Sequence, residues 1–93
     1  MSNKNKLRHE GPTRLTFHAR IKMEARGISR SAVMETIANP FVRRVARNGC
    51  RSVTAPQLCG HRIFWLVVIV GPDPRGGEQV VTAYPLEASP PAA

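Results

Sequence analysis

The chain has 93 residues, 42% of them apolar, which is enough for one small hydrophobic core and too few residues for two domains. Fourteen Lys and Arg residues against six Asp and Glu residues give a formal net charge of +8. This charge favours a nucleic-acid backbone or an acidic protein as the partner, although a solvated basic surface without a ligand is the simpler alternative.

The positive charge is concentrated in the first two thirds of the chain. Residues 1–62 hold 13 basic and 3 acidic side chains, whereas residues 63–93 hold 1 basic and 3 acidic side chains. Most of the basic residues are Arg, whose planar guanidinium group can donate two hydrogen bonds to one phosphate.

Several classes of site find no support in the sequence. The first residues are polar and no apolar segment of a signal peptide follows them, so we expect a cytoplasmic site of action and no membrane segment. Cys50 and Cys59 lack zinc-ligand or Cys-x-x-Cys spacing, and we expect free thiols, with a local disulfide as the alternative. The acidic residues are scattered, so we expect neither a metal nor a cofactor.

Composition divides the chain into three segments. Residues 1–12 form a predicted flexible basic arm that ends in Gly-Pro. Residues 13–85 form the predicted single folded domain. Residues 86–93 contain Ser-Pro-Pro-Ala-Ala and are predicted to be a disordered tail.

The first predicted helix spans residues 13–27. Thr16 is suited to cap its start, and Gly27 is suited to end it, with Ile28 as the apolar contact that follows. At 100° per residue the helix carries two apolar stripes, one of Phe17, Ile21 and Ala25 and one of Ala19 and Met23. A basic strip of His18, Lys22 and Arg26 runs between them. The strip indicates either a binding surface or basic side chains at the edge of a core.

The second predicted helix spans Arg30–Ala38. Ser29 is suited to cap its start, and Asn39-Pro40 ends it, because Pro cannot continue a helix. Its predicted inner face consists of Val33, Met34 and Ile37.

Beyond residue 40 the apolar pattern changes to the period of two that is typical of strands. We predict strands at residues 41–46, 50–55, 61–71 and 78–84, with a hairpin turn at Asn48-Gly49 and a loop at residues 56–60. The third of these strands carries the apolar run Ile63–Val70, which is too short to cross a bilayer and is predicted to be buried on both faces. The predicted fold is α+β, with two N-terminal helices packed on an antiparallel meander of about four strands.

Four arginines cluster in the first predicted hairpin. They are Arg43, Arg44, Arg47 and Arg51. Charges on an edge strand protect it from aggregation, and they can also follow the phosphates of RNA. Both interpretations remain open from the sequence.

Some of the residues could support RNA cleavage, in which the ribose 2′-OH attacks the adjacent phosphorus. His18 is suited to act as an acid or a base near neutral pH, and Arg62 could stabilise the charged phosphorane. Thr82 and Tyr84 share one face of the last strand and could orient the ribose. Many basic domains contain such residues, so their presence alone is a weak signal.

Three short motifs resemble a family of small bacterial domains. They are Thr16-Phe-His-Ala-Arg20, Arg26-Gly-Ile-Ser29 and Val81-Thr-Ala-Tyr-Pro85. This family is grouped with the RelE-like and barnase-like ribonuclease toxins, which are metal-independent. The resemblance implies helices packed on an antiparallel sheet and functional roles for His18, Arg26, Thr82 and Tyr84. The segment at residues 56–60 departs from the family pattern.

We therefore expect a metal-independent endoribonuclease toxin of a toxin–antitoxin or polymorphic toxin system. It would act on tRNA, mRNA or rRNA, and an acidic antitoxin or immunity protein would neutralise its basic surface. The expected catalytic residues are His18, Arg62, Thr82 and Tyr84, and the expected phosphate ligands are Lys22, Arg26, Arg43, Arg44, Arg47 and Arg51.

Two alternatives remain. One is a nucleic-acid-binding module without catalysis, which would depend on phosphate contacts because one Tyr, one Trp and three Phe argue against an aromatic platform for bases. The other is a toxin of the same fold that binds a protein target such as gyrase.

Overall fold

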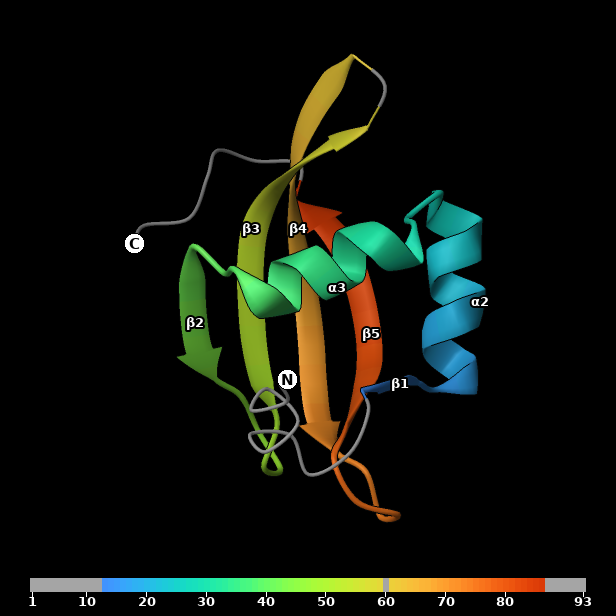
Figure 1. Ribbon diagram of the computed structural model, residues 1–93, viewed down its shortest axis with the longest axis vertical. Coiled ribbons are helices and arrows are strands. Elements are labelled where there is room, and N and C mark those ends of the chain that lie inside the picture. The colour runs from blue at the N-terminus through green and yellow to red at the C-terminus, as the bar shows by residue number, and fades with distance from the viewer. Residues whose placement is uncertain (1–12, 60, 87–93) are drawn as a thin grey trace, which may run out of the picture.

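The computed structural model describes residues 13–59 and 61–86, with the main chain alone at Cys59. Within these residues the domain is α+β, with two helices and a sheet of five strands (Figure 1). The elements are β1 (Arg14–Leu15), α2 (Phe17–Arg26), α3 (Arg30–Ala38), β2 (Val42–Val45), β3 (Arg51–Cys59), β4 (Arg62–Pro72) and β5 (Glu78–Leu86). The predicted arm at residues 1–12 and residues 87–93 of the predicted tail lie outside the described residues. Leu86, which was assigned to the tail, belongs to β5.

The sheet is mixed and has the strand order β1-β5-β4-β3-β2. Strands β2 to β5 pair antiparallel with their neighbours, and β1 pairs parallel with β5. The sequence predicted about four strands and did not predict β1, which arises from residues assigned to the first helix. Arg14 and Leu15 are extended because the helix begins only at Phe17, and they pair with Gln79 and Val80.

The ends of both helices are set by local capping interactions, as predicted. The Thr16 hydroxyl accepts a hydrogen bond of 3.0 Å from the Ala19 N–H, and the Ser29 hydroxyl accepts one of 3.0 Å from the Ala32 N–H. Gly27 ends α2 in the left-handed conformation at φ 67°. The buried Ile28 follows at once, so α2 and α3 form a tight corner.

The turn between β2 and β3 also matches the prediction. Asn48 and Gly49 have φ values of 58° and 77°, which is the left-handed backbone that a two-residue hairpin turn of type I′ requires. The turn is closed by the Cys50 N–H, which donates a hydrogen bond of 3.0 Å to the Arg47 carbonyl.

The loop predicted at residues 56–60 is wrong, because β3 continues through Cys59. Pro56 pairs with Trp65, and Cys59 pairs with Arg62, so β3 and β4 project beyond the other strands as a two-stranded arm (Figure 1). Proline is tolerated in this strand because β2 has already ended, and no neighbour on that side needs the missing N–H.

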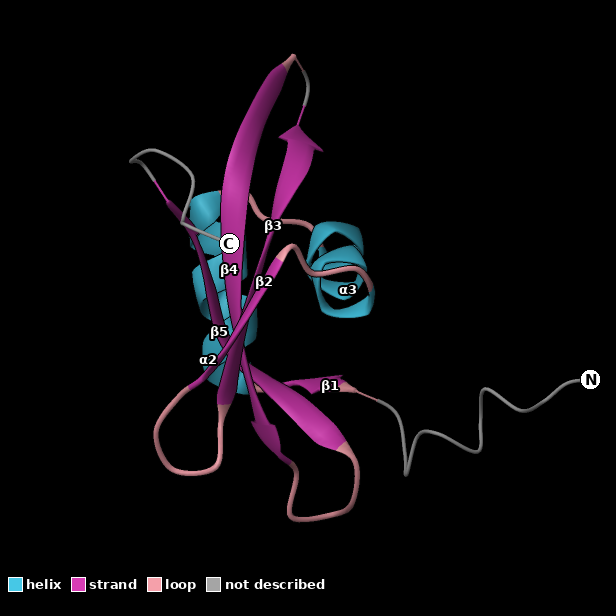
Figure 2. Ribbon diagram, turned by 90° about the vertical axis from the view of Figure 1, so that its left-hand side faces the viewer, coloured by secondary structure: helices cyan, strands magenta, loops and turns pink. Residues whose placement is uncertain are grey.

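The core lies between the helices and one face of the sheet. Figure 2 shows α3 over this face, and α2 packs along β5. On β4 the inward residues are Leu66, Val68 and Val70, and all three are almost fully buried. They form one cluster with Ala19, Met23, Ile28, Val33, Val53, Val80 and Ala83.

The inner face of α3 differs in part from the predicted one. Val33 and Thr36 are fully buried, whereas Met34 and Ile37 are only half-buried. The hydroxyl of Thr36 is satisfied because it donates a hydrogen bond of 2.8 Å to the Ala32 carbonyl and accepts one of 3.0 Å from Nε2 of Gln57. Thr36 therefore joins α3 to the base of the projecting arm.

We call the opposite side of the sheet the distal face. It carries Ser52 and Thr54 of β3, Trp65, Val67 and Ile69 of β4, and Thr82 and Tyr84 of β5. Val67 is buried on this face, as predicted for a strand buried on both sides, but Ile63 is 70% exposed because it lies on the projecting arm.

Candidate nucleic-acid interface

Helix α2 lies along the outer edge of β5 and is attached to it at both ends. At its start, the N–H and the hydroxyl of Thr16 donate hydrogen bonds of 3.1 and 3.0 Å to the Val80 carbonyl. At its end, Nη1 of Arg26 donates a hydrogen bond of 2.7 Å to the Ala83 carbonyl. The side chains of α2 are therefore held at fixed positions beside β5.

The two predicted apolar stripes of α2 differ in how far they are buried. Ala19 and Met23 are buried against the sheet, whereas Phe17 and Ile21 are 77% and 49% exposed. The basic strip of His18, Lys22 and Arg26 lies between these stripes, as the helical spacing requires. His18 is exposed and Lys22 is half-buried.

Helix handedness determines which side of the domain the strip faces. Lys22 and His18 lie about 60° and 100° around the helix from Ala19, on the flank opposite Arg20. Figure 1 shows α2 running beside β5 with α3 in front of the sheet, and Ala19 and Met23 are buried. For a right-handed helix in this orientation, the flank that carries Lys22 and His18 is the one away from α3. The strip therefore faces the same side as the distal face of the sheet.

Thr82 and Tyr84 lie on β5, the strand that runs beside α2. In register, Thr82 lies opposite Ile69 and Tyr84 lies opposite Val67, so both side chains belong to the distal face. Tyr84 is 37% exposed and Thr82 is half-buried. The residue between them is Ala83, whose carbonyl binds Arg26, so the guanidinium group lies at the main chain between these two hydroxyl-bearing residues.

His18 lies on the same edge, near the N-terminal end of α2. It is two helical turns from Arg26, about 12 Å along the helix axis. It is two residues from Thr16, which is bonded to Val80. The structure thus brings His18, Lys22, Arg26, Thr82 and Tyr84 to one edge without placing all five around a single point.

Arg62 does not join these residues. It is the first residue of β4 and lies at the tip of the projecting arm. Val67, the residue opposite Tyr84, is five residues and about 17 Å further along the strand. Because side chains alternate along a strand and five is an odd number, Arg62 and Val67 also lie on opposite faces of the sheet. Arg62 is exposed, and it cannot contact the same phosphate as Arg26 in this arrangement.

The four arginines of the first hairpin do not form one surface. Arg43 lies opposite Val53 on the side of α3, Arg44 lies opposite Ser52 on the distal face, and Arg47 belongs to the turn. Arg51 forms an ion pair with Glu78 across β4, with Nη2 and Oε1 3.2 Å apart. The alternation of side chains along the strands separates them.

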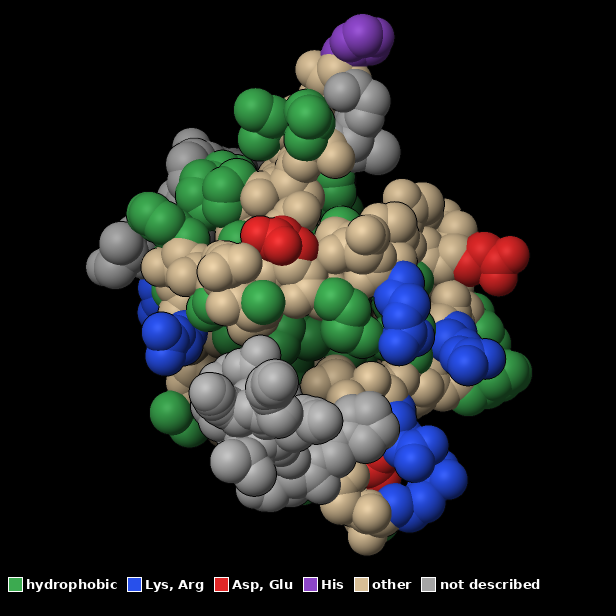
Figure 3. Space-filling model, viewed as in Figure 1, with side chains coloured by type: hydrophobic (Ala, Val, Ile, Leu, Met, Phe, Trp, Pro, Cys, Tyr) green, Lys and Arg blue, Asp and Glu red, His purple; other side chains and the backbone are tan. Residues whose placement is uncertain are grey.

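Figure 3 gives the charge distribution on the side of α3. Lys and Arg side chains lie at the α2 edge, at the β2 edge and near the turn after β4, with apolar surface between them. Among the described residues seen from this side, the Lys and Arg side chains therefore lie in separate groups.

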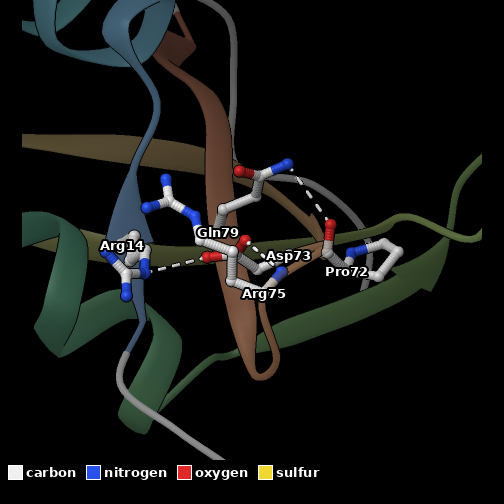
Figure 4. A network of polar contacts seen from close by, with 5 residues as sticks. All are labelled: Arg14, Pro72, Asp73, Arg75 and Gln79. Atoms are coloured by element: carbon white, nitrogen blue, oxygen red, sulfur yellow. Dashed lines mark hydrogen bonds and ion pairs between the residues drawn. The ribbon is translucent and has the colours of Figure 1, made fainter.

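An ion pair that the sequence did not predict joins β1 to the turn after β4 (Figure 4). Nε of Arg14 lies 3.0 Å from Oδ2 of Asp73, whose side chain is 2% exposed. The Arg75 N–H donates a hydrogen bond of 3.0 Å to Oδ1 of the same carboxylate. The sequence of residues 72–77 predicted a turn, and nothing in it predicted a partner for Asp73. The ion pair fastens β1, and with it the start of α2, to that turn.

Three findings bear on other kinds of site. Among the described residues, no three His, Cys, Asp or Glu side chains are grouped so that they could hold a metal ion. In the same part of the chain, neither helix has the length and apolar character needed to span a membrane. Cys50 is a half-buried free thiol, as predicted, and the side chain of Cys59 lies outside the described residues.

The chain belongs to a family described as a domain of unknown function, DUF4258, whose pattern matches residues 15–85. The match includes the three motifs on which the sequence resemblance depends. The family description assigns no activity, so the link to ribonuclease toxins stays a prediction. Searches of curated proteins and of solved structures found no match.

Proposed function

We propose that this DUF4258 domain is a metal-independent endoribonuclease toxin that binds RNA along the α2–β5 edge. The observation that carries the proposal is the position of Arg26, which is bonded to Ala83 between Thr82 and Tyr84. Lys22 and His18 extend the same positive flank along the edge. Arg26 next to Thr82 and Tyr84 is suited to hold a phosphodiester and its ribose, and cleavage further requires that His18, about 12 Å along the helix axis, reach the same nucleotide.

In the proposed reaction the 2′-oxygen forms a bond to phosphorus while the bond from phosphorus to the 5′-oxygen breaks. His18 accepts the proton of the 2′-OH or donates a proton to the departing 5′-oxygen, and solvent water exchanges the other proton. Arg26 and Lys22 stabilise the charge on the phosphorane, and Thr82 and Tyr84 orient the ribose. Arg26 has further N–H groups besides the one bonded to Ala83 with which to bind phosphate oxygens.

Arg62 has a different role in this proposal from the catalytic one expected from the sequence. Because it lies about 17 Å along β4 from the position opposite Tyr84, it would contact a separate part of the RNA. Arg43, Arg44 and Arg47 would do the same at the β2 edge. Arg51 contributes less, since Glu78 already neutralises it.

The partner in the cell would be an acidic antitoxin or immunity protein. The net charge of +8 supports this part of the proposal, because a protein that is toxic through RNA must be held inactive by something that competes for its basic surface. The same charge also fits RNA, and the two partners would therefore exclude each other.

RNA binding without cleavage is the second candidate function. It is favoured by the distance of about 12 Å along α2 between His18 and the anchored Arg26. If a bound phosphate cannot reach both side chains, His18 becomes one more contact to the backbone of the RNA.

Incubation of the purified protein with total RNA in EDTA tests the proposal. The wild type is compared with His18→Ala and with His61→Ala, a matched control because His61 is also exposed but lies in the turn of the projecting arm. Discrete cleavage by the wild type and His61→Ala, and loss of at least about 100-fold in rate for His18→Ala, is the expected result. Equal cleavage by all three proteins would remove His18 from the mechanism. Binding without cleavage would favour the second candidate.

A further inference from the structure

Three aromatic side chains gather on or beside the distal face. The rings of Phe41 and Trp65 are 5.3 Å apart between centroids and inclined by 60°. Tyr84 lies diagonally from Trp65 on the neighbouring strand, because Tyr84 is opposite Val67 and Trp65 is opposite Leu86. Diagonal neighbours of this kind are about 7–8 Å apart, within reach of aromatic side chains.

The three rings are accessible to different degrees. Phe41 is 54% exposed, Tyr84 is 37% exposed and Trp65 is half-buried. A soluble domain rarely leaves several aromatic rings exposed on one face of a sheet without a use for them. The chain has one Trp, one Tyr and three Phe; the Trp and the Tyr lie on this face, and Phe41 contacts Trp65 beside it.

Basic residues lie beside the rings at the β5 edge and further along the distal face at β2. Lys22 and Arg26 lie beyond Tyr84 at the β5 edge, and Arg44 lies on the distal face of β2. The distance from β5 to β2 across the sheet is three strand spacings, about 14 Å. Cations beside Tyr84, and a further one about 10 Å along β2 from Phe41, are complementary to a chain that alternates negative phosphates with flat bases.

We propose that the distal face binds single-stranded RNA by stacking its bases on Tyr84, Trp65 and Phe41. This inference rests on the proposed function, because the RNA would reach the rings from the α2–β5 edge. A four-stranded sheet of similar width holds two or three stacked bases in a common class of RNA-binding domain. The low count of aromatic residues argued against such a platform, but the count ignores where the fold places them.

The chemistry favours single strands over a duplex. In a duplex the faces of the bases are already stacked on each other, and the strand presents only phosphates and groove edges to a flat sheet. Unpaired bases can be turned outward onto the rings while the phosphates remain near Lys22 and Arg26. Specificity for base identity is not required, since every base has a face that can stack.

The single Trp makes the test direct, because all tryptophan fluorescence comes from Trp65. The 93-residue chain is titrated with an eight-nucleotide oligouridylate, with oligoadenylate, and with a duplex of the same length. We expect a change in Trp65 emission with either single strand and at least about fivefold weaker binding of the duplex.

Phe41→Leu should weaken single-strand binding at least about fivefold. Phe17→Leu is the matched control, because Phe17 is 77% exposed on the outer side of α2. Equal effects of the two substitutions, or unchanged Trp65 emission when RNA is bound, would overturn the inference. So would an emission change with protein concentration alone, which would indicate that a second copy covers this face.

Failure of the inference can be separated from failure of the proposed function. Binding that is lost in Lys22→Ala but unaffected in Phe41→Leu would leave the α2–β5 edge as the RNA site and remove the aromatic platform. Binding that depends on Phe41, without any cleavage, would support the aromatic platform and contradict the proposed ribonuclease activity. No binding of any RNA would reject both.

Discussion

Arg26 donates a hydrogen bond of 2.7 Å to the main-chain carbonyl of Ala83, which lies 57 positions away in the sequence. The bond joins the last turn of α2 to the outer edge of β5. An open strand edge presents unpaired carbonyl groups that other chains can bind. Here Arg26 and Thr16 bind the carbonyls of Ala83 and Val80, so the same residues that close the edge also place the basic strip beside it.

Arg26→Ala should lower the free energy of unfolding by about 1–2 kcal/mol, because it removes a hydrogen bond from a charged donor at a partly exposed position. Urea denaturation followed by circular dichroism measures this change. Arg20→Ala is the control, since Arg20 is exposed on the other flank of α2, and it should change stability by less than about 0.5 kcal/mol. Equal losses in the two variants would mean that the bond to Ala83 adds nothing to stability.

Asp73→Asn should destabilise the attachment of β1. The substitution keeps an acceptor for the Arg75 N–H but removes the negative charge that lies 3.0 Å from Arg14. We expect a loss of about 1–2 kcal/mol, less than for a fully buried ion pair because the Arg14 side chain is 45% exposed. Amide hydrogen exchange at Thr16, which bonds to the Val80 carbonyl, should become faster.

Glu24→Gln provides the matched control for this experiment, because Glu24 is an exposed carboxylate on α2. A double-mutant cycle of Arg14→Ala with Asp73→Asn should give a coupling free energy of about 1 kcal/mol. Additive effects of the two substitutions would show that the ion pair does not fasten β1.

Features that depend on a few adjacent residues were predictable from the sequence. Thr16, Gly27 and Ser29 set the helix ends, and Asn48-Gly49 makes the turn, because each acts on its own backbone or on that of near neighbours. The strip of His18, Lys22 and Arg26 was predictable for the same reason, since helical spacing alone defines it.

Features that depend on distant partners were not predictable. The extended conformation at Arg14–Leu15 follows from pairing with residues 79–80, and the strand at Pro56 is allowed only because β2 ends earlier. The choice between two apolar stripes on α2 required knowledge of what packs on it. The separation of Arg62 from Tyr84 required the register of β4 and β5, which no local pattern contains.

Gly71→Ala should destabilise the domain through a single contact. A Cβ atom at Gly71 would lie 2.8 Å from Sγ of Cys50, closer than two such atoms can approach. We expect a loss of about 1–2 kcal/mol from this overpacking, measured by thermal or urea denaturation. In a Cys50→Ala background the same substitution should cost less than about 0.5 kcal/mol.

Gly49→Ala is the control for the effect of Cys50→Ala on the cost of Gly71→Ala. A Cβ at Gly49 meets no atom within 4 Å, and its cost would come from the backbone φ of 77° instead. The Cys50→Ala background should therefore leave the cost of Gly49→Ala unchanged. If Cys50→Ala relieved neither or both substitutions, the contact between Gly71 and Cys50 would not be the cause.

The salt dependence of RNA binding should identify which basic residues contact phosphate. Each phosphate contact to single-stranded RNA contributes about 0.7 to the slope of log K against log salt concentration. Lys22→Ala should reduce the slope by about that amount, because Lys22 lies on the flank that faces the distal side. Arg20→Ala, on the other flank of α2, and Arg51→Ala, whose charge is paired with Glu78, should leave the slope nearly unchanged. Equal reductions in all three variants would indicate diffuse attraction to the whole basic domain, and the α2–β5 edge would then have no special role in RNA binding.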